Sequence, residues 1–291
     1  MSTARAGAQS AAPDTSELVE RHLRHLASLV LSRLQEVLEH QERLVVSTKT
    51  AVYDLVTDVD RSVEAWLWEE VHRVFPEDGF LGEEHGWRLG PTGARDWVVD
   101  PIDGTTNFAS GLPWACCSIA ALCSGSAGVG VIVDPYRGEI HLTASVAKGS
   151  EVNGETVRVS PGGDLEGKVV LFEVPSGVSP SVLQVVEQAV LRRGGASRVM
   201  GSGALALASV AAGRAQATVH AGPNIWDVAA GVALVEHAGG VVLGAAAPYL
   251  LGAPGPLVAG SAETCEVLQP LLVGLDTGVA RSLSEREGGG H

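Results

Sequence analysis

The sequence predicts a mixed protein of the α+β or α/β class, and three observations support this prediction. Residues 18 to about 44 place apolar side chains at helical spacing, which indicates one long amphipathic helix. Short apolar runs separated by turn residues dominate residues 97–143, which is typical of the strands of a sheet. From about residue 165 to 265, strand-like and helix-like segments alternate, and this favours an α/β lobe.

The elements of the first half follow in order. After the long helix, Thr57-Asp58 is a capping pair for a second helix that runs to about Phe75, where a Pro and an Asp-Gly pair stop it. Strands are then expected at residues 97–100, 115–123, 128–133 and 138–143. Asn153-Gly154 lies between two short strand-like segments, so we predict a hairpin turn there.

In the second half, the pattern changes after the turn residues 161–163. The expected order is a strand at 169–174, a helix at 181–193, a strand near 198, a helix at 202–212, a strand at 215–219, a helix at 226–237 and a strand at 241–243. We therefore divide the chain into a disordered leader (1–16), an N-terminal α+β lobe with a metal site (17–163), a C-terminal α/β lobe that completes the site (164–281) and a loose tail (282–291).

Composition and charge exclude several classes of protein. The 291 residues are 45% hydrophobic, which is enough for one large core or two joined lobes. The formal net charge of −14 argues against binding a nucleic-acid polymer, because phosphate backbones are bound by an excess of Lys and Arg. The longest apolar run falls short of the roughly 18 residues of a membrane-spanning helix. We expect no membrane association, a cytoplasmic location, and reduced thiols at the four cysteines.

The stretch WVVDPIDGTTNF, residues 97–108, places two carboxylates near a helix start. An apolar run ends at Asp100, and Asp103-Gly104 is a turn pair ahead of Thr105. The first N–H groups of a helix attract anions, and Mg²⁺ is held by carboxylates together with substrate phosphate oxygens. The segment therefore suggests metal-assisted phosphate chemistry. Asp-Pro and Asp-Gly are also ordinary turn pairs, so the segment alone leaves a purely structural role open.

Two further segments add to this motif. GEEHG covers residues 82–86, and IWDVAAGVALVEHAGG covers residues 225–240 with an acid at a helix start. Together with residues 97–108, and with KTAVYDLVTDVDRSVE at residues 49–64, they resemble the inositol monophosphatase family in order and spacing. The resemblance implies a layered α-β-α-β-α sandwich of the inositol monophosphatase and fructose-1,6-bisphosphatase type. It also implies a homodimeric, lithium-sensitive, Mg²⁺-dependent phosphomonoesterase.

The resemblance further implies a ligand set for two or three Mg²⁺ ions. A first ion would be held by Glu83, Asp100 and the backbone carbonyl of Ile102. A second would be held by Asp100, Asp103 and Asp227. A carboxylate with two oxygens can bridge two ions, of which one generates the attacking hydroxide and the other stabilises the leaving oxygen. For Asp227, ordinary capping of a helix start is the alternative interpretation.

Three residues are expected to act on the attacking water. Glu83 would hold and deprotonate it, and the Thr105 hydroxyl would orient it. Asp60 would hydrogen-bond the threonine from behind, although an acid in the first turn of a helix is also common for structural reasons. Asp58 is expected to be a cap, and Glu84 to support Glu83 from outside the ligand set.

The phosphate of the substrate is expected at the turn into the helix that follows Asp103. Backbone N–H groups of Gly104 and Thr105 would bind its oxygens, with Asp103 and Asp227 beside them. A helix cap without a ligand is the alternative for this turn.

The rest of the substrate is expected to contact the second lobe. Gly201, Ser202 and Gly203 stand where the family carries a Gly-Thr-Ala that lines the substrate pocket. His220 stands seven residues before Asp227, where inositol phosphatases carry an acidic residue that contacts substrate hydroxyls. A neutral imidazole accepts one hydrogen bond and offers a flat face. The chain therefore departs from the inositol-specific pattern at this position.

The leading functional prediction is hydrolysis of inositol monophosphate or a related polyol or sugar phosphate. A first alternative keeps the chemistry and changes the small phosphorylated substrate to a nucleotide or a biosynthetic intermediate, including histidinol phosphate. A second alternative is a binding or regulatory protein that has kept the fold and lost turnover. The presence of every expected metal ligand argues against this second alternative, because unpaired buried carboxylates are costly without cations.

Overall fold

The computed structural model describes residues 15–40, 45–48, 55–88, 90, 95–123, 126–143, 149–174, 180–245 and 255–287. Most of the predicted leader, residues 1–14, lies outside the described residues. Across the described part of the chain, no helix is both long and apolar enough to cross a membrane.

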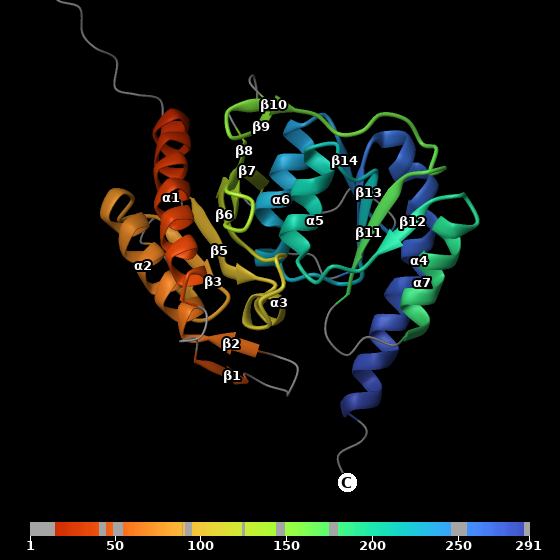
Figure 1. Ribbon diagram of the computed structural model, residues 1–291, viewed down its shortest axis with the longest axis horizontal. Helices are drawn as coiled ribbons and strands as arrows, with labels where there is room; N and C mark the ends of the chain where they lie inside the picture. Colours follow the sequence, from red (N-terminus) through yellow and green to blue (C-terminus); the bar gives the residue numbers. More distant parts are fainter. Residues whose placement is uncertain are drawn as a thin grey trace, which may run out of the picture.

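Five layers make up the fold, in the order helix, sheet, helix, sheet, helix (Figure 1). Helices α1 and α2 cover one face of an eight-stranded sheet, α5 and α6 lie between the two sheets, and α4 and α7 cover the outer face of a five-stranded sheet. The helices are α1 Thr15–Leu38, α2 Asp58–Val74, α3 Thr105–Ala109, α4 Pro180–Leu191, α5 Gly203–Ala211, α6 Ile225–His237 and α7 Ala262–Glu287. The layered α-β-α-β-α sandwich is therefore the observed fold.

The larger sheet has the strand order β10-β9-β8-β7-β6-β5-β3-β4 and is antiparallel except where β3 runs parallel to β5. Its strands are β3 Gly79–Gly82, β4 Gly86–Arg88, β5 Asp96–Asp103, β6 Cys116–Cys123, β7 Ser126–Asp134, β8 Glu139–Thr143, β9 Ser150–Val152 and β10 Glu155–Val157. The predicted hairpin turn at Asn153-Gly154 joins β9 to β10, with φ of 50° and 88°. Positive φ at both residues is the reason that Asn-Gly suits this turn.

The smaller sheet has the order β12-β11-β13-β15-β14. Strand β11 runs parallel to β12 and β13, whereas β15 runs antiparallel to β13 and β14. Its strands are β11 Val169–Glu173, β12 Ala196–Arg198, β13 Ala217–His220, β14 Val241–Gly244 and β15 Leu257–Gly260. A separate antiparallel pair is formed by β1 Val46–Thr48 and β2 Leu55–Thr57.

Alternate residues of the central strand β5 separate two hydrophobic cores. Trp97 and Val99 pack with α1 and α2, while Val98 packs with α5 and α6. This is the period of two that a strand buried on both faces requires. The five-stranded sheet has a third core against α4 and α7.

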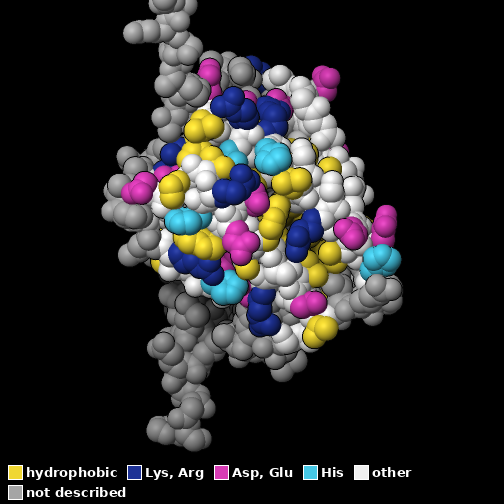
Figure 2. Space-filling model, turned by 90° about the vertical axis from the view of Figure 1, so that its left-hand side faces the viewer, with side chains coloured by type: hydrophobic (Ala, Val, Ile, Leu, Met, Phe, Trp, Pro, Cys, Tyr) yellow, Lys and Arg dark blue, Asp and Glu magenta, His cyan; other side chains and the backbone are white. Residues whose placement is uncertain are grey.

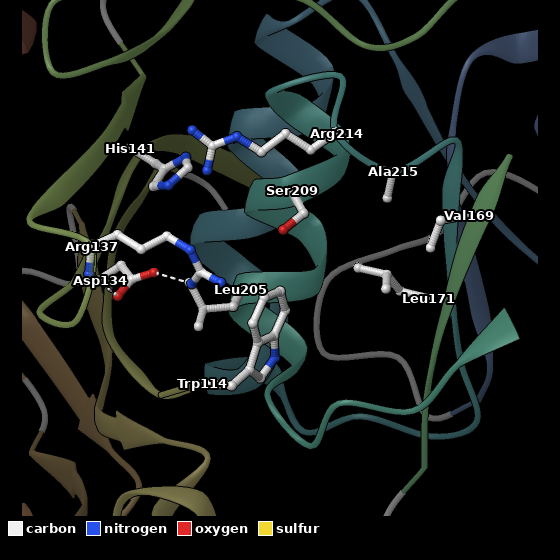
Figure 3. Close-up of a pocket in the computed structure, with 10 residues that line it drawn as sticks. All are labelled: Trp114, Asp134, Arg137, His141, Val169, Leu171, Leu205, Ser209, Arg214 and Ala215. Atoms are coloured by element: carbon white, nitrogen blue, oxygen red, sulfur yellow. Dashed lines mark hydrogen bonds and ion pairs between the residues drawn. The ribbon is translucent and has the colours of Figure 1, made fainter. Parts of the chain in front are cut away.

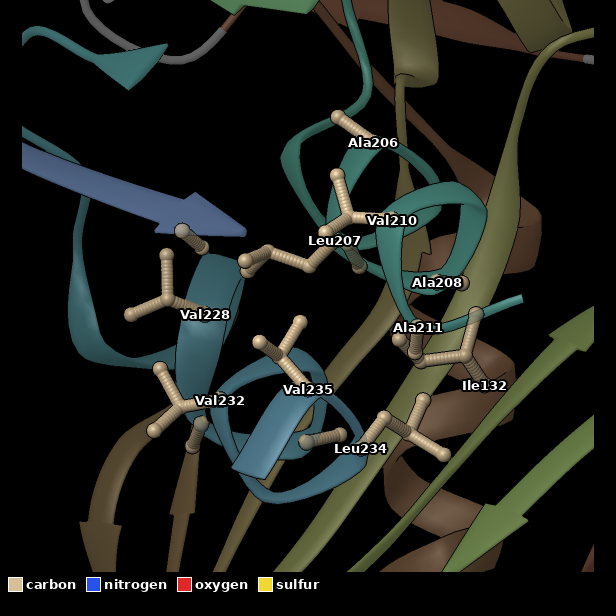
Figure 4. Packing of buried hydrophobic residues seen from close by; sticks show 14 of the residues in the cluster. Ile132, Ala206, Leu207, Ala208, Val210, Ala211, Val228, Val232, Leu234 and Val235 are labelled. Carbon is tan, nitrogen blue, oxygen red and sulfur yellow. The ribbon is translucent and has the colours of Figure 1, made fainter. Parts of the chain in front are cut away.

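The middle layer is packed closely enough to demand small residues. Helices α5 and α6 cross with Leu207 against Gly231, where an added Cβ would lie 2.4 Å from the Leu207 Cβ. Leu207, Val228, Val232 and Val235 fill the space between these helices and the sheets (Figure 4). Asp227 lies in the first turn of α6, so this packing also fixes the position of a predicted site residue.

Five elements differ from the sequence analysis. Strands β3, β4 and β15 were not expected, because they are short and glycine-containing, and their pairing depends on burial beside other strands. Helix α7 continues to Glu287, so residues 282–287 of the predicted loose tail are helical. Helix α1 ends at Leu38, earlier than the expected residue 44.

Candidate metal centre

Asp100 and Asp103 both lie on β5, and a bulge in that strand brings them together. Three residues apart, they would point to opposite faces of a regular strand. Between them the register with β6 shifts, because Asp100 is opposite Ser118 and Asp103 is opposite Cys116. A bulge adds one residue on one strand and re-aims its side chains. Pro101, which has no N–H to donate to the ladder, stands inside this irregular segment.

The carboxylates of Asp100, Asp103 and Asp227 form a cluster, with one oxygen from each within 4.8 Å of the others. Asp100 and Asp103 are buried. In the described part of the chain, no Lys or Arg forms an ion pair with any of the three. Burial raises the pKa of Asp100 well above its ordinary value, and the nearby Glu83 carboxylate raises it further. Burial likewise raises the pKa of Asp103 to about 6. Such a cluster is costly as bare charge and suits a cation.

Asp103 is held at the N-terminus of α5. Its Oδ2 accepts hydrogen bonds from the Ser202 hydroxyl at 2.6 Å and from the Ala204 backbone N–H at 2.7 Å. The thiol of Cys116 lies 3.9 Å from the same oxygen. Ser202, which the sequence analysis expected to line the substrate pocket, therefore orients a carboxylate of the cluster.

Thr105 and Asp60 meet as predicted. The Thr105 hydroxyl lies 3.1 Å from Asp60 Oδ1 and 2.9 Å from the Ile102 carbonyl oxygen. The other oxygen of Asp60 closes a capping box with Thr57, whose N–H donates at 2.9 Å. One carboxylate oxygen of Asp60 therefore contacts Thr105 and the other closes the helix cap, so the two interpretations are compatible. The N-cap of α2 is Thr57, and Asp58 is the first helical residue.

Asp227 is also used twice. One of its oxygens, Oδ2, accepts the Asn224 backbone N–H at 2.7 Å in a capping box at the start of α6. Its other oxygen can face the cluster with Asp100 and Asp103. The capping box accounts for an acidic residue in the first turn of α6. The cluster gives the same residue a second set of neighbours, Asp100 and Asp103.

Glu83 follows β3 directly and lies near Asp100, whose pKa its charge raises. Its backbone N–H donates to the Val99 carbonyl at 3.2 Å, which extends the parallel pairing of β3 and β5. Behind this turn lies Glu64, a buried residue of α2 for which the sequence analysis gave no role.

The turn at Gly104 joins the cluster to α3. Gly104 has a φ of 88°, and an added Cβ would lie 3.0 Å from the carbonyl oxygens of Gly201 and Trp114. No side chain caps α3 at this residue. Asn107 links the turn to the second lobe, because its side-chain amide donates to the Met200 carbonyl at 2.7 Å. The same amide donates to the Trp114 carbonyl, in the first lobe, at 2.8 Å. Only glycine fits the turn in both conformation and space.

His220 lies in the interior, with 2% of its surface exposed. Its ring is beneath the start of α5, where an added Cβ on Gly203 would lie 3.2 Å from the ring carbon Cε1. Its Nε2 is 3.2 Å from the Thr218 hydroxyl. Burial lowers the pKa of His220 to about 3, so the imidazole is neutral near pH 7.

Glu173 is a buried acid that the sequence analysis missed. It is opposite His220 in the β11–β13 pairing, and its carboxylate accepts the backbone N–H groups of Gly201 at 2.9 Å and Met200 at 3.3 Å. Burial raises the pKa of Glu173 to about 8. An acid that ends a buried strand, as in VVLFE, is the signal that could have identified it.

A separate pocket of about 180 Å³ opens between the lobes beside α5, and no predicted site residue lines it (Figure 3). Val169 and Leu171 form one wall, while Arg137 and Arg214 approach from the other side. Each guanidinium already has a carboxylate partner, Arg137 with Asp134 at 2.6 Å and Arg214 with Glu139.

The fold is a five-layer α/β sandwich, and the carboxylate cluster at its bulged strand and helix start could hold a metal ion. The comparison with protein families identifies the family: the inositol monophosphatase family matches residues 16–274. The chain belongs to this family.

Individual relatives agree with this assignment. A protein of Xylella fastidiosa named Nus factor SuhB is 39% identical over 234 residues, which are 76% of this chain and 82% of that protein. The crystal structure of the extragenic suppressor protein suhB from Bartonella henselae aligns with a TM-score of 0.82 at 30% identity, over 88% of this chain and 98% of that one. An inositol monophosphatase from Anabaena aligns with a TM-score of 0.73 at 27% identity, over 90% and 97% of the two chains.

Proposed function

We propose that this chain is a Mg²⁺-dependent phosphomonoesterase, with inositol monophosphate or a related polyol or sugar phosphate as its substrate. The observation that carries the proposal is the cluster of Asp100, Asp103 and Asp227, which has no basic partner among the described residues. Three carboxylates gathered in this way repel one another and repel a phosphate unless cations are present.

The donor set fits Mg²⁺, because this ion prefers oxygen ligands and is commonly held by a few carboxylates, water and substrate phosphate. Glu83, Asp100 and the Ile102 carbonyl would hold one ion, and Asp100, Asp103 and Asp227 another. The carbonyl oxygen of Ile102 has two lone pairs, so it can accept from Thr105 and still serve as a ligand. When bound, Mg²⁺ lowers the pKa of a coordinated water and stabilises charge on the leaving oxygen.

The residues of the chain would hold and orient the reactants. The Thr105 hydroxyl, whose single proton faces Asp60 and the Ile102 carbonyl, would accept a hydrogen bond from the attacking water, and Glu83 would take a proton from that water. The backbone N–H groups of Gly104 and Thr105 would bind the phosphate oxygens. Gly201 and Gly203 would border the rest of the substrate, since they flank Ser202 at the start of α5.

The alcohol part of the substrate is proposed to contact the second lobe, where His220 lies. The neutral His220 stands where an acidic residue contacts substrate hydroxyls in inositol phosphatases. A nucleotide or a biosynthetic intermediate such as histidinol phosphate is therefore an alternative substrate class.

A phosphate-release assay over a panel of small monophosphates tests the proposal. We expect turnover of at least one polyol or sugar monophosphate with Mg²⁺, and loss of that turnover with excess chelator. Restoration by Mg²⁺ is the control for irreversible damage. Full turnover after exhaustive chelation would overturn the metal assignment, and exclusive turnover of nucleotides or histidinol phosphate would replace the substrate class.

From the same resemblance we propose inhibition by Li⁺, a homodimer and a cytoplasmic location. Inhibition is measured as the Li⁺ concentration that halves turnover, with K⁺ at equal ionic strength as the control. Light scattering after size-exclusion chromatography measures the mass, and a monomer mass would remove the dimer from the proposal. Fractionation of cells tests the location.

A second candidate function is a binding or regulatory role, which the name Nus factor of several relatives favours. The face formed by α1 and α2 mixes Arg, His, acidic and hydrophobic side chains (Figure 2). On it, Arg24 pairs with Glu20, Arg33 lies over the Trp66 ring and Arg88 over the Trp68 ring. Such a mixed face suits a protein partner better than a nucleic-acid polymer. A folded, Mg²⁺-binding protein with no turnover on the whole panel would favour this second function.

A further inference from the structure

Glu64 is a buried carboxylate that lies behind the turn carrying Glu83. It is in the second turn of α2 and is 1% exposed. Its Oε2 accepts the backbone N–H of Glu84 at 2.7 Å. Its Oε1 accepts the backbone N–H of His85 at 3.0 Å and lies 2.7 Å from the Nδ1 of the same residue. Both oxygens of Glu64 are therefore used by the two residues that follow Glu83.

The turn and the carboxylate are in direct contact. An added Cβ on Gly82 would lie 2.1 Å from the carboxyl carbon of Glu64. Glycine at this position lets the backbone approach the carboxylate closely enough for the hydrogen bonds of Glu84 and His85. The contact with Glu64 therefore explains why the first residue of GEEHG, Gly82, is a glycine.

Glu83 is consequently held from two sides. Its own N–H is bound to Val99 on β5, the strand that also carries Asp100. The residues after it are bound to Glu64 on α2. Since the backbone is fixed before and after Glu83, the position of its Cα and the direction of its Cα–Cβ bond are fixed as well, and its side chain interacts with Asp100.

A carboxylate is the group that these contacts require. Two backbone N–H groups and one ring nitrogen converge on two oxygens, and a carboxylate accepts at both. A glutamine of the same shape has one oxygen and one NH₂ group, so it would leave an N–H facing an NH₂. The cost of such a buried, unmatched donor is large enough to move the turn.

We propose that Glu64 is a positioning residue that fixes the turn of residues 83–85, aims Glu83 at Asp100, and thereby sets the affinity of the site for Mg²⁺. The proposal rests on the proposed function in one respect, the assignment of Glu83 as a metal ligand. It requires no particular substrate.

Glu64→Gln tests the proposal through Mg²⁺ binding measured by titration calorimetry without substrate. The matched control is Glu69→Gln, because Glu69 lies on the same helix, is exposed, and loses the same charge. We expect about 10- to 100-fold weaker Mg²⁺ binding in Glu64→Gln and an unchanged dissociation constant in Glu69→Gln. The measurement is made well below the melting temperature of each variant, so that loss of fold is not read as loss of affinity.

A second variant, His85→Ala, tests the same contact if Glu64→Gln does not fold. His85→Ala removes the ring contact and leaves both backbone hydrogen bonds to Glu64, so we expect a loss of affinity that is measurable but smaller, below about tenfold. Unchanged Mg²⁺ binding in a folded Glu64→Gln protein overturns the proposal, even if its melting temperature falls. If Glu64→Gln does not fold, unchanged binding in His85→Ala overturns it.

The failure of the proposed function has a different signature. A wild-type protein that binds Mg²⁺ without turning over any monophosphate would overturn the enzymatic proposal and leave the comparison of dissociation constants intact. A wild-type protein that binds no Mg²⁺ would overturn both.

Discussion

Asp100 and Asp103 lie on one strand of the larger sheet, whereas Asp227 comes from α6, in the layer between the two sheets. The first half of the site is acidic and is braced by further acids, Asp60 behind Thr105 and Glu64 behind Glu83. Its members also lie in short, contiguous motifs. The metal-assisted hydrolysis proposed above would depend mainly on this half.

The second half contributes mainly neutral groups. Ser202 donates to Asp103, Gly201 is bound by Glu173, and His220 is a buried neutral imidazole. It is also the half in which the chain departs from the inositol-specific pattern. The difference favours a division in which most of the proposed chemistry belongs to the first half, with Asp227 as the contribution of the second, while the choice of substrate belongs to the second half.

The largest expected effect is on the acidic half. Asp100→Asn removes charge from the carboxylate proposed to bridge two ions, and we expect kcat/KM to fall by at least about a hundredfold because metal-based stabilisation is worth several kcal/mol. Asp96→Asn, at the start of the same strand and outside the cluster, is the control. Full activity in Asp100→Asn would contradict the proposed role of Asp100 as a metal ligand, and with it the assignment of catalysis to the larger sheet.

Thr105→Ala separates water orientation from metal binding. We expect kcat to fall by about 10²-fold, with the dissociation constant for Mg²⁺ unchanged, because a positioned proton-transfer group contributes to the chemical step. Thr105→Ser, which keeps a hydroxyl, is expected to recover most of the rate. A change in KM alone would mean that Thr105 binds substrate and has no part in the step itself.

His220→Glu tests whether the second half selects the substrate. We expect the ratio of kcat/KM for inositol monophosphate to that for the best substrate of the panel to rise by about tenfold, since a carboxylate accepts hydrogen bonds from hydroxyls. The assay uses saturating Mg²⁺, and His25→Glu on the exposed face of α1 is the control. An unchanged ratio would leave His220 as a packing residue under α5.

The last prediction concerns the dependence of stability on pH. The pKa of His220 is lowered by burial from 6.5 to about 3, so between these values the unfolded chain binds a proton that the folded chain does not. Stability is therefore lost as pH falls below about 6.5, by at most ~1.4 kcal/mol for each pH unit. His220→Gln lacks this group, so its free energy of unfolding should fall less steeply than that of the wild type between pH 7 and pH 4.5. The free energy of unfolding is measured by denaturant titration at each pH. An equal fall with pH in the two proteins would contradict the burial of His220.

Local sequence was sufficient for much of the architecture. Apart from β3 and β4, the order of helices and strands from α2 to α6 follows from periodicity and turn residues, as at Thr57 and at Asn153-Gly154. The motif of residues 97–108 also predicted Asp100 and Asp103 as site residues of the first half. These features were predictable because each depends on neighbours within a few residues: a cap, a turn, or an alternation along one strand.

The sequence by itself determined which chemical groups are present, and the tertiary structure decided which of them meet. Asp227 joins Asp103 across 124 positions of the chain, Glu64 reaches the turn after Glu83, and Glu173 reaches Gly201. Strand β3 exists because it is buried beside β5, although its own residues, GFLG, include two glycines. Such contacts are set by the packing of two sheets around α5 and α6, and burial then raises the pKa of Asp103, Glu173 and Asp227. Neither burial nor a distant partner is encoded in the few residues around a position, which is why these features required the folded chain.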